Sequence, residues 1–130
     1  MTPHVKLTLS LLKDRYALCR LDPYAGVPTW AARGDFWSVV RNAEEVSVLC
    51  PQENIPENVE AEPGWCTLEL AGPLSFSQAG ILDSVVEPLS HAEISILVVS
   101  AYDTSYVLLK EEVLDKAADV LSGVGHTVNR

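Results

Sequence analysis

Basic side chains are scarce in this 130-residue chain. Nine lysines and arginines stand against eighteen aspartates and glutamates, which gives a formal net charge of −9. Affinity for nucleic acids rests largely on basic groups that displace counterions from phosphates, and anionic lipid surfaces attract clusters of the same residues. The composition therefore argues against both nucleic acids and membranes as partners.

Cysteine and histidine are also few, and none of them belongs to a chemical motif. Cys19, Cys50 and Cys66 each lie in an apolar run, and no CxxC or HxxxH spacing is present. We therefore expect buried, reduced thiols and no metal site. No Gly-x-Ser-x-Gly elbow or phosphate-binding glycine loop occurs, so neither catalysis nor a cofactor is expected.

No apolar run is long enough to cross a bilayer. The longest one, residues 94–99, is far shorter than the about 20 residues that a membrane-spanning helix needs. The first four residues, Met1 to His4, lack the basic and apolar regions of a signal peptide. These absences predict a cytoplasmic protein.

Alternating apolar residues predict strands throughout the chain, at residues 5–12, 16–21, 36–41, 46–50, 66–70, 94–100, 106–110 and 126–128. A short helical turn is predicted at residues 29–32, and the acidic, proline-rich residues 51–63 are typical of a solvated linker. Ser75 to Gln78 has the form of a capping box before a helix. Pro88 removes one hydrogen bond from that helix and should kink its last turn. A second helix is predicted over residues 113–121. The predicted apolar faces of the two helices are Ile81, Leu82, Val85, Val86 and Leu89 in the first, and Val113, Leu114, Ala117, Ala118 and Leu121 in the second.

The order of these elements predicts the fold class. From residue 61 onward it is strand-helix-strand-strand-helix-strand, the ferredoxin-like βαββαβ arrangement with helices on one face of an antiparallel sheet. The first half repeats part of it, because Val39 and Val40 align with Val98 and Val99 and the same offset aligns the following strands. We predict an α+β protein of two tandem modules, a degenerate one at residues 1–60 and a complete one at residues 61–130.

Modules of this size bury little surface when alone. We therefore expect the two modules to pack side by side and to leave an apolar face for a second chain. This size argument leads to the hypothesis of a homodimer.

Three stretches carry a family resemblance: AGPLSFSQAGI at residues 71–81, ISILVVSAYDTSY at residues 94–106 and VLLKEE at residues 107–112. With them, residues 66–121 resemble an ACT domain of the type found in CASTOR-like arginine sensors and their small prokaryotic relatives. The first half of the chain is similar to the degenerate leading module of that family. The resemblance implies a non-catalytic regulatory protein that binds an amino acid.

The resemblance also implies where the effector binds. ACT domains pair side by side and hold a small effector at the interface. The matching positions are Gln78, Ala79, Gly80 and Ile81 from one module, Ser95 and Ile96 from the facing module, and Ala101, Tyr102 and Ser105 from a turn that closes the pocket.

Physical chemistry supports this location independently. The N–H groups and positive dipole end of a helix N-terminus suit the carboxylate of an amino acid, and Asp103 suits its ammonium group. Gly80 lets a ligand approach the backbone closely, although helix–sheet packing explains a glycine equally well. For Tyr102, strand preference favours a half-buried sheet aromatic over a ligand contact.

Two positions depart from an arginine site. Gln78 and Ser105 are neutral where such a site places acids to meet the guanidinium. Each lost charge-assisted hydrogen bond costs about 1.5–3 kcal/mol. The sequence therefore predicts a neutral or small amino acid as the effector, and the alternative is a ligand-free dimeric interaction module.

Overall fold

The structure is a computed structural model, and it describes residues 5–71 and 80–130. Contacts divide the chain into two compact units. Residues 1–13 and 66–130 form unit 1, and residues 14–65 form unit 2. This division differs from the predicted boundary after residue 60, because the N-terminal strand groups with the second half of the chain.

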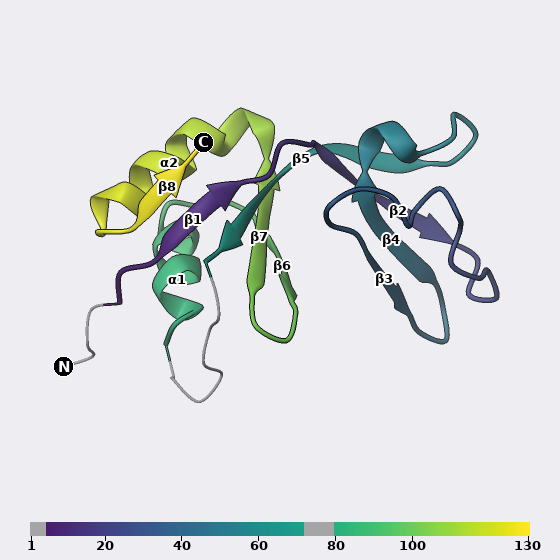
Figure 1. Cartoon of the computed structure of the whole chain (residues 1–130), viewed down its shortest axis with the longest axis horizontal. Helices are drawn as coiled ribbons and strands as arrows, with labels where there is room; N and C mark the ends of the chain where they lie inside the picture. The colour runs from purple at the N-terminus through teal and green to yellow at the C-terminus, as the bar shows by residue number, and fades with distance from the viewer. Residues whose placement is uncertain (1–4, 72–79) are drawn as a thin grey trace. The chain divides into compact units, whose positions relative to one another are not determined.

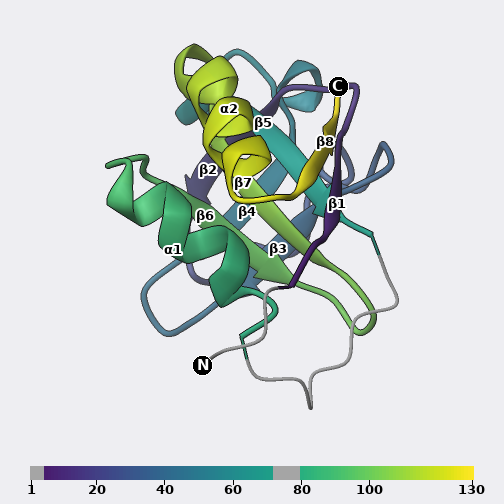
Figure 2. The same ribbon diagram turned by 90° about the vertical axis from the view of Figure 1, so that its left-hand side faces the viewer.

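Unit 1 is a five-stranded sheet with two helices on one face (Figures 1 and 2). The strand order is β6-β7-β5-β1-β8. The elements are β1 (Thr8–Leu11), β5 (Ala61–Leu70), α1 (Asp83–His91), β6 (Leu97–Ser100), β7 (Ser105–Lys110), η2 (Glu111–Val113), α2 (Leu114–Gly123) and β8 (Thr127–Asn129). The ferredoxin-like α+β fold predicted for this region is confirmed.

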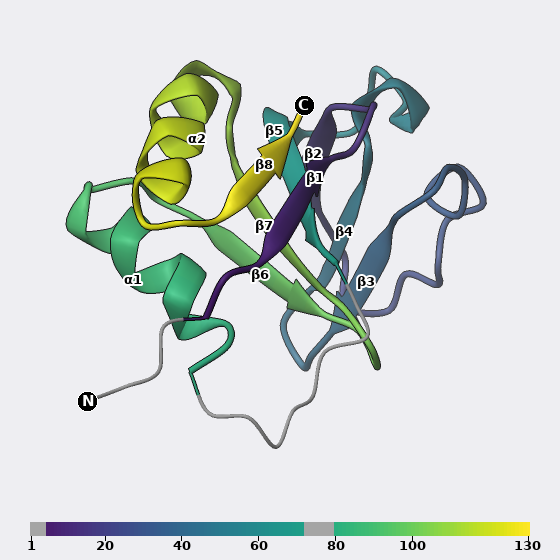
Figure 3. The ribbon, with the colours of Figure 1, turned by 60° about the vertical axis from the view of Figure 1, so that its left-hand side comes forward.

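The position of β1 was not predicted. It lies between β5 and β8, antiparallel to β5 at Leu9↔Leu70 and parallel to β8 at Leu9↔Val128. In the plain ferredoxin-like order the last strand pairs antiparallel with the first. Here β1 is antiparallel to β5 and parallel to β8. The last strand β8 therefore still runs antiparallel to β5, although β1 lies between them (Figure 3).

The core of unit 1 lies between the sheet and the helices. As the sequence pattern predicts, α1 turns Val85 and Leu89 inward, and α2 does so with Leu114, Ala117 and Leu121. Full burial of an aliphatic side chain stabilises the fold by about 1.5–3 kcal/mol. The strands contribute Leu9, Cys66, Leu68, Leu70, Val107 and Leu109 to the same core.

Unit 2 is an antiparallel sheet in the order β3-β4-β2-β5, to which β5 contributes its first residues. The other strands are β2 (Tyr16–Leu21), β3 (Ser38–Arg41) and β4 (Val46–Pro51), followed by η1 (Gln52–Asn54). Residues 14–65 contain no α-helix. Residues 29–32, predicted as a helical turn, do not form a helix. They belong to a single hydrogen-bonded turn in which the Ala31 N–H donates to the Pro28 carbonyl.

The segment between β2 and β3 contributes to the core of unit 2. Ala31 is fully buried there, and Trp30 packs beside it against the valines and cysteines of β2 and β4. The stretch predicted as a solvated linker is only partly so. Ile55 and Val59 pack against the same core, and β5 already begins at Ala61. Their apolar side chains outweigh the acidic composition of the stretch.

Buried His126 connects three elements of unit 1. Its Nδ1 accepts a hydrogen bond from the Leu7 N–H at 3.0 Å, and its Nε2 lies 2.8 Å from the Ser84 carbonyl oxygen. Because Nδ1 accepts, the proton of the neutral ring is on Nε2, which therefore donates to Ser84. The ring thus joins the residues before β1 and β8 to the first turn of α1.

Pro88 explains why the Ser84 carbonyl needs this donor. In an α-helix the N–H of residue 88 would bond to the carbonyl of residue 84, but proline has no N–H. Pro88 lies within α1, and His126 supplies the missing donor from outside the helix. The lost hydrogen bond was predicted from the sequence, whereas its replacement was not.

Replacing His126 by phenylalanine should therefore destabilise the protein by about 2–4 kcal/mol, because it leaves the Leu7 N–H and the Ser84 carbonyl unpaired. In a Pro88→Ala background the loss should be smaller by about 1 kcal/mol, since the new N–H of residue 88 can bond to Ser84. Urea unfolding of the four proteins of this double-mutant cycle measures the coupling. Strictly additive losses would contradict the compensation.

Candidate functional site

The loop–helix junction of unit 1 is shaped by Gly80. Its φ is +88°, in the left-handed region, and a Cβ at this position would meet no atom of residues 5–71 and 80–130 within 4 Å. The Gly80 carbonyl accepts the Ser84 N–H at 3.0 Å, and the Ser84 hydroxyl donates to the Ile81 carbonyl at 2.6 Å. Packing therefore does not require a glycine here, but the backbone angle favours one. The proposed ligand residues Gln78 and Ala79, and the capping box at 75–78, lie outside the described residues.

The N-terminal end of α1 carries a carboxylate of its own. The N-cap residue is Leu82, which makes no side-chain cap, and exposed Asp83 lies in the first turn. The helix dipole stabilises an anion at this place by about 0.3–1 kcal/mol. A carboxylate ligand that approached this helix end would gain the same dipole interaction but would meet repulsion from Asp83.

Ser95 and Ile96 lie at the opposite end of α1. The helix ends in a tight turn in which Glu93 has φ 61° and the Ile94 N–H donates to the Leu89 carbonyl. Ser95 is exposed, whereas Ile96 is half-buried against the core. Nine residues of helix, about 13 Å long, separate these two residues from Gly80. One copy of α1 therefore does not bring the two predicted groups together.

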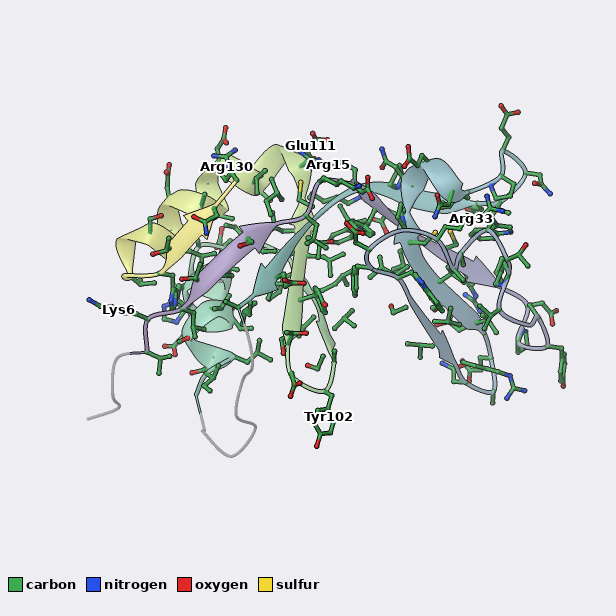
Figure 4. The ribbon with its side chains drawn as sticks, in the orientation of Figure 1. Lys6, Arg15, Arg33, Tyr102, Glu111 and Arg130 are labelled. Atoms are coloured by element: carbon green, nitrogen blue, oxygen red, sulfur yellow. The ribbon has the colours of Figure 1, made fainter. Side chains whose placement is uncertain are left out.

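The hairpin between β6 and β7 carries the remaining predicted residues. Ala101 donates its N–H to the Thr104 carbonyl at 2.8 Å and closes the tip. Tyr102 is 90% exposed and points away from the hairpin (Figure 4), and Asp103 is exposed beside it. The prediction of a half-buried sheet aromatic at Tyr102 is wrong, because this residue lies in the turn and not in a strand.

Ser105 differs from its neighbours in the tip. It is the first residue of β7, is only 3% exposed, and its Oγ lies 3.4 Å from the Oγ of Ser100 on the paired strand. In this structure its hydroxyl faces another strand residue. The tip therefore offers the aromatic ring of Tyr102 and the carboxylate of Asp103 to the solvent.

The metal-ligating side chains and histidines of the described residues have the following positions. No group of three or more metal-ligating side chains occurs in residues 5–71 and 80–130. Exposed His91 lies in the last turn of α1, with Nε2 4.0 Å from a Glu87 oxygen. His126 has both ring nitrogens hydrogen-bonded to the backbone. His4 lies outside the described residues.

A groove in unit 2 was not predicted from the sequence. Its volume is about 510 Å³, and it lies between β2 and the beginning of β5. The residues that line it are Leu18, Arg20, Glu60, Ala61, Glu62 and Pro63. The only available signal was the acidic stretch before β5, which is equally typical of a solvated loop.

All three cysteines are free and buried, as predicted. Cys19 and Cys50 belong to the same core cluster in unit 2. Burial raises the pKa of the Cys19 thiol, and burial together with the nearby Cys19 raises the pKa of Cys50 to about 11. Both groups therefore stay protonated and unreactive at neutral pH.

Comparison with known proteins identifies the class of this chain. A family model described as an ACT domain matches residues 60–123, and a model described as an N-terminal domain matches residues 14–58. The regulatory subunit of aspartate kinase from Thermus thermophilus has the same fold, with a TM-score of 0.64 and 12% identity over 94% of this chain and 99% of that one. Residues 60–123 therefore contain an ACT domain.

The family follows from a relative of nearly equal length. Protein Atu0741 from Agobacterium tumefaciens is 36% identical, with a TM-score of 0.90 over 95% of this chain and 92% of that one. The chain belongs to the same family as Atu0741. Protein VC0802 from Vibrio cholerae, described as a possible transport protein of unknown function, shares the fold with a TM-score of 0.75 and 15% identity over 92% of this chain and 91% of that one. No curated protein sequence matches significantly.

Neither helix in the described part of the chain has the length and apolar character needed to cross a bilayer.

The raised pKa of Cys50 predicts a loss of stability at alkaline pH. A thiol in the unfolded chain loses its proton near its ordinary pKa of 9.0, whereas folded Cys50 keeps it until about pH 11. The unfolded state therefore binds fewer protons in this window, and the free energy of unfolding falls as pH rises from 9 to 11. Urea unfolding at several pH values should show a shallower fall for Cys50→Ala than for the wild type. Equal slopes would mean that Cys50 does not contribute.

Proposed function

We propose that this protein is a non-catalytic regulatory protein whose ACT domain binds a small amino acid. The observation that carries the proposal is the junction at Gly80, a glycine in the left-handed conformation just before the N-terminal end of α1. Because glycine has no side chain, a ligand can come close to the backbone there. Backbone N–H groups and the helix dipole favour a carboxylate at such a place. The aspartate kinase subunit from Thermus thermophilus is a regulatory subunit by name, and its fold, which this chain shares, supports a regulatory role.

The proposed effector site combines the two ends of α1 from two subunits. Gly80 and Ser95 are separated by the length of the helix within one module, and the other module contains no α-helix, so a ligand that touches both ends needs a second chain. A side-by-side homodimer would bring Gly80 of one copy near Ser95 of the other. The hairpin tip, with Tyr102 and Asp103 exposed, is suited to cover a ligand and to hold its ammonium group.

The CASTOR-like tandem organisation is part of the same proposal. Unit 2 would be the degenerate leading module, because its sheet repeats the strands of an ACT module while an irregular segment replaces the helix between β2 and β3. Neutral Gln78 and Ser105 stand where an arginine sensor has acids, so a neutral or small amino acid is the proposed effector.

A ligand-free interaction module is the second candidate function. The observation in its favour is Asp83, which already supplies a carboxylate to the first turn of α1. A helix end stabilised in this way needs no anionic ligand. The screen below separates the two functions.

A thermal-shift screen against the twenty amino acids tests the proposed function. A ligand at a hundredfold its Kd adds about 2.7 kcal/mol to stability, which is several degrees in a chain of this size. We expect a shift with one or two neutral amino acids. No shift with any of them at millimolar concentration would favour the interaction module.

Two substitutions of Gly80 locate the site. Both Gly80→Ala and Gly80→Trp carry the strain of a side chain at φ +88°, about 1–2 kcal/mol, but only tryptophan adds bulk. The alanine variant should keep the effector-induced shift, and the tryptophan variant should lose it. A shift that persists in the tryptophan variant would place the effector elsewhere.

Asp83→Asn provides an independent test of carboxylate binding at α1. The substitution removes the repulsion between Asp83 and an incoming carboxylate, so the affinity for the effector should rise about threefold to tenfold. Without effector, the variant should lose about 0.3–1 kcal/mol of stability, because the dipole interaction of Asp83 is lost. Calorimetric titration of both proteins with the effector measures the change, and an unchanged or lower affinity would contradict the placement.

A further inference from the structure

The groove in unit 2, called the unit-2 groove below, has the size of a small-molecule site. Its 510 Å³ lies within the range of about 300–1,000 Å³ that is typical of ligand pockets. Leu18 of β2 pairs with Glu62 of β5, and Cys19 pairs with Ala61. The antiparallel register therefore places Arg20 beside Glu60, on the same face as Leu18 and Glu62.

A β-bulge shapes this groove. Tyr16 pairs with Trp65 but Leu18 pairs with Glu62, so β5 uses one residue more than β2 over the same stretch. Gly64 lies in this bulge with a φ of +85°, in the left-handed region, and its N–H donates a hydrogen bond to the Gln52 side-chain oxygen at 3.0 Å. Bulges commonly re-aim side chains at binding sites. The shape of the unit-2 groove beside Leu18 is thus set by the backbone conformation of β5.

The lining combines charges of both signs with an apolar surface. Arg20 supplies a guanidinium whose Nε is 3.2 Å from a Glu45 oxygen, so its ion-pair partner in this structure is Glu45 and not Glu60. Glu60 makes no ion pair among the described residues. Half-buried Leu18 and Ala61, together with Pro63, supply apolar contacts between the charged groups.

We propose that the unit-2 groove binds a basic α-amino acid of the lysine type, independently of the effector site in the ACT domain. The lining offers two carboxylates, Glu60 and Glu62, and one guanidinium, Arg20. The complementary ligand has two cationic groups and one anionic group, which is the charge pattern of lysine at neutral pH. Its carboxylate pairs with Arg20, its two ammonium groups face Glu60 and Glu62, and its methylene chain lies over Leu18 and Pro63.

Calorimetric titration of the full chain with lysine tests this proposal. Norleucine lacks only the side-chain ammonium group, and 1,5-diaminopentane lacks only the carboxylate. Each lost charged contact should weaken binding about tenfold, and added salt should weaken lysine binding further. No binding of lysine, or equal binding of either analogue, would overturn the proposal.

Three variants assign the binding to the groove. Glu60→Gln and Arg20→Gln should each weaken lysine binding about tenfold, while Glu57→Gln, at an exposed glutamate outside the groove, should leave it unchanged. Far-UV circular dichroism checks that each variant is folded. Equal loss in all three variants would indicate a general charge effect and would overturn the assignment.

Gly80→Trp separates this site from the one proposed in the ACT domain. Lysine binding should persist in that variant, even though the effector of the ACT domain no longer binds. Lysine binding that is lost in Gly80→Trp but kept in Glu60→Gln would overturn the groove as the lysine site. Failure of the amino-acid screen with neutral effectors leaves the lysine titration interpretable, because the two sites share no residue.

Discussion

The integrity of the ACT sheet depends on how the N-terminal strand is held in its middle. Leu7 donates its N–H to His126 and accepts the N–H of Thr127 at 2.9 Å, so both of its backbone groups are used before β1 begins. His126 in turn supplies the hydrogen bond that Pro88 denies to α1. The buried His126 ring thereby provides a hydrogen-bond partner both for the Leu7 N–H before β1 and for the Ser84 carbonyl of α1. A fragment that started at β5 would lack the strand between β5 and β8 and could not close this sheet.

Much of the fold could be predicted from local pattern, because alternation and helical stripes are local properties. β2 has the predicted bounds, and the buried faces of both helices were recognised from Val85, Leu89 and their equivalents. The insertion of β1 beside β8 could not be predicted, since it joins residues more than a hundred positions apart. The role of His126 was missed for the same reason.

The candidate sites show a similar limit. The sequence interpretation favoured a half-buried sheet aromatic at Tyr102 because aromatic residues prefer strands, but the turn between Ala101 and Thr104 excludes it. The unit-2 groove depends on a bulge and on the register of β2 with β5. Neither could be predicted from the residues around Pro63. The charges of the two sites also differ. One lies near a helix end that already has a carboxylate, and the other combines a guanidinium with two carboxylates, so the two sites would select different ligands.

The outer strand of unit 2 has a consequence for the behaviour of the protein in solution. β3 has a hydrogen-bonded neighbour on one side only, its register with β4 is unbroken, and Trp37 and Val40 are substantially exposed. Of the features that usually protect such an edge from pairing with another chain, it has its short length and the charge of Arg41, but no lysine, proline or bulge. The net charge of −9 keeps molecules apart through mutual repulsion. Colloidal stability is therefore tied to the ionised carboxylates, and acidification or concentrated salt would remove the barrier between neighbouring edges.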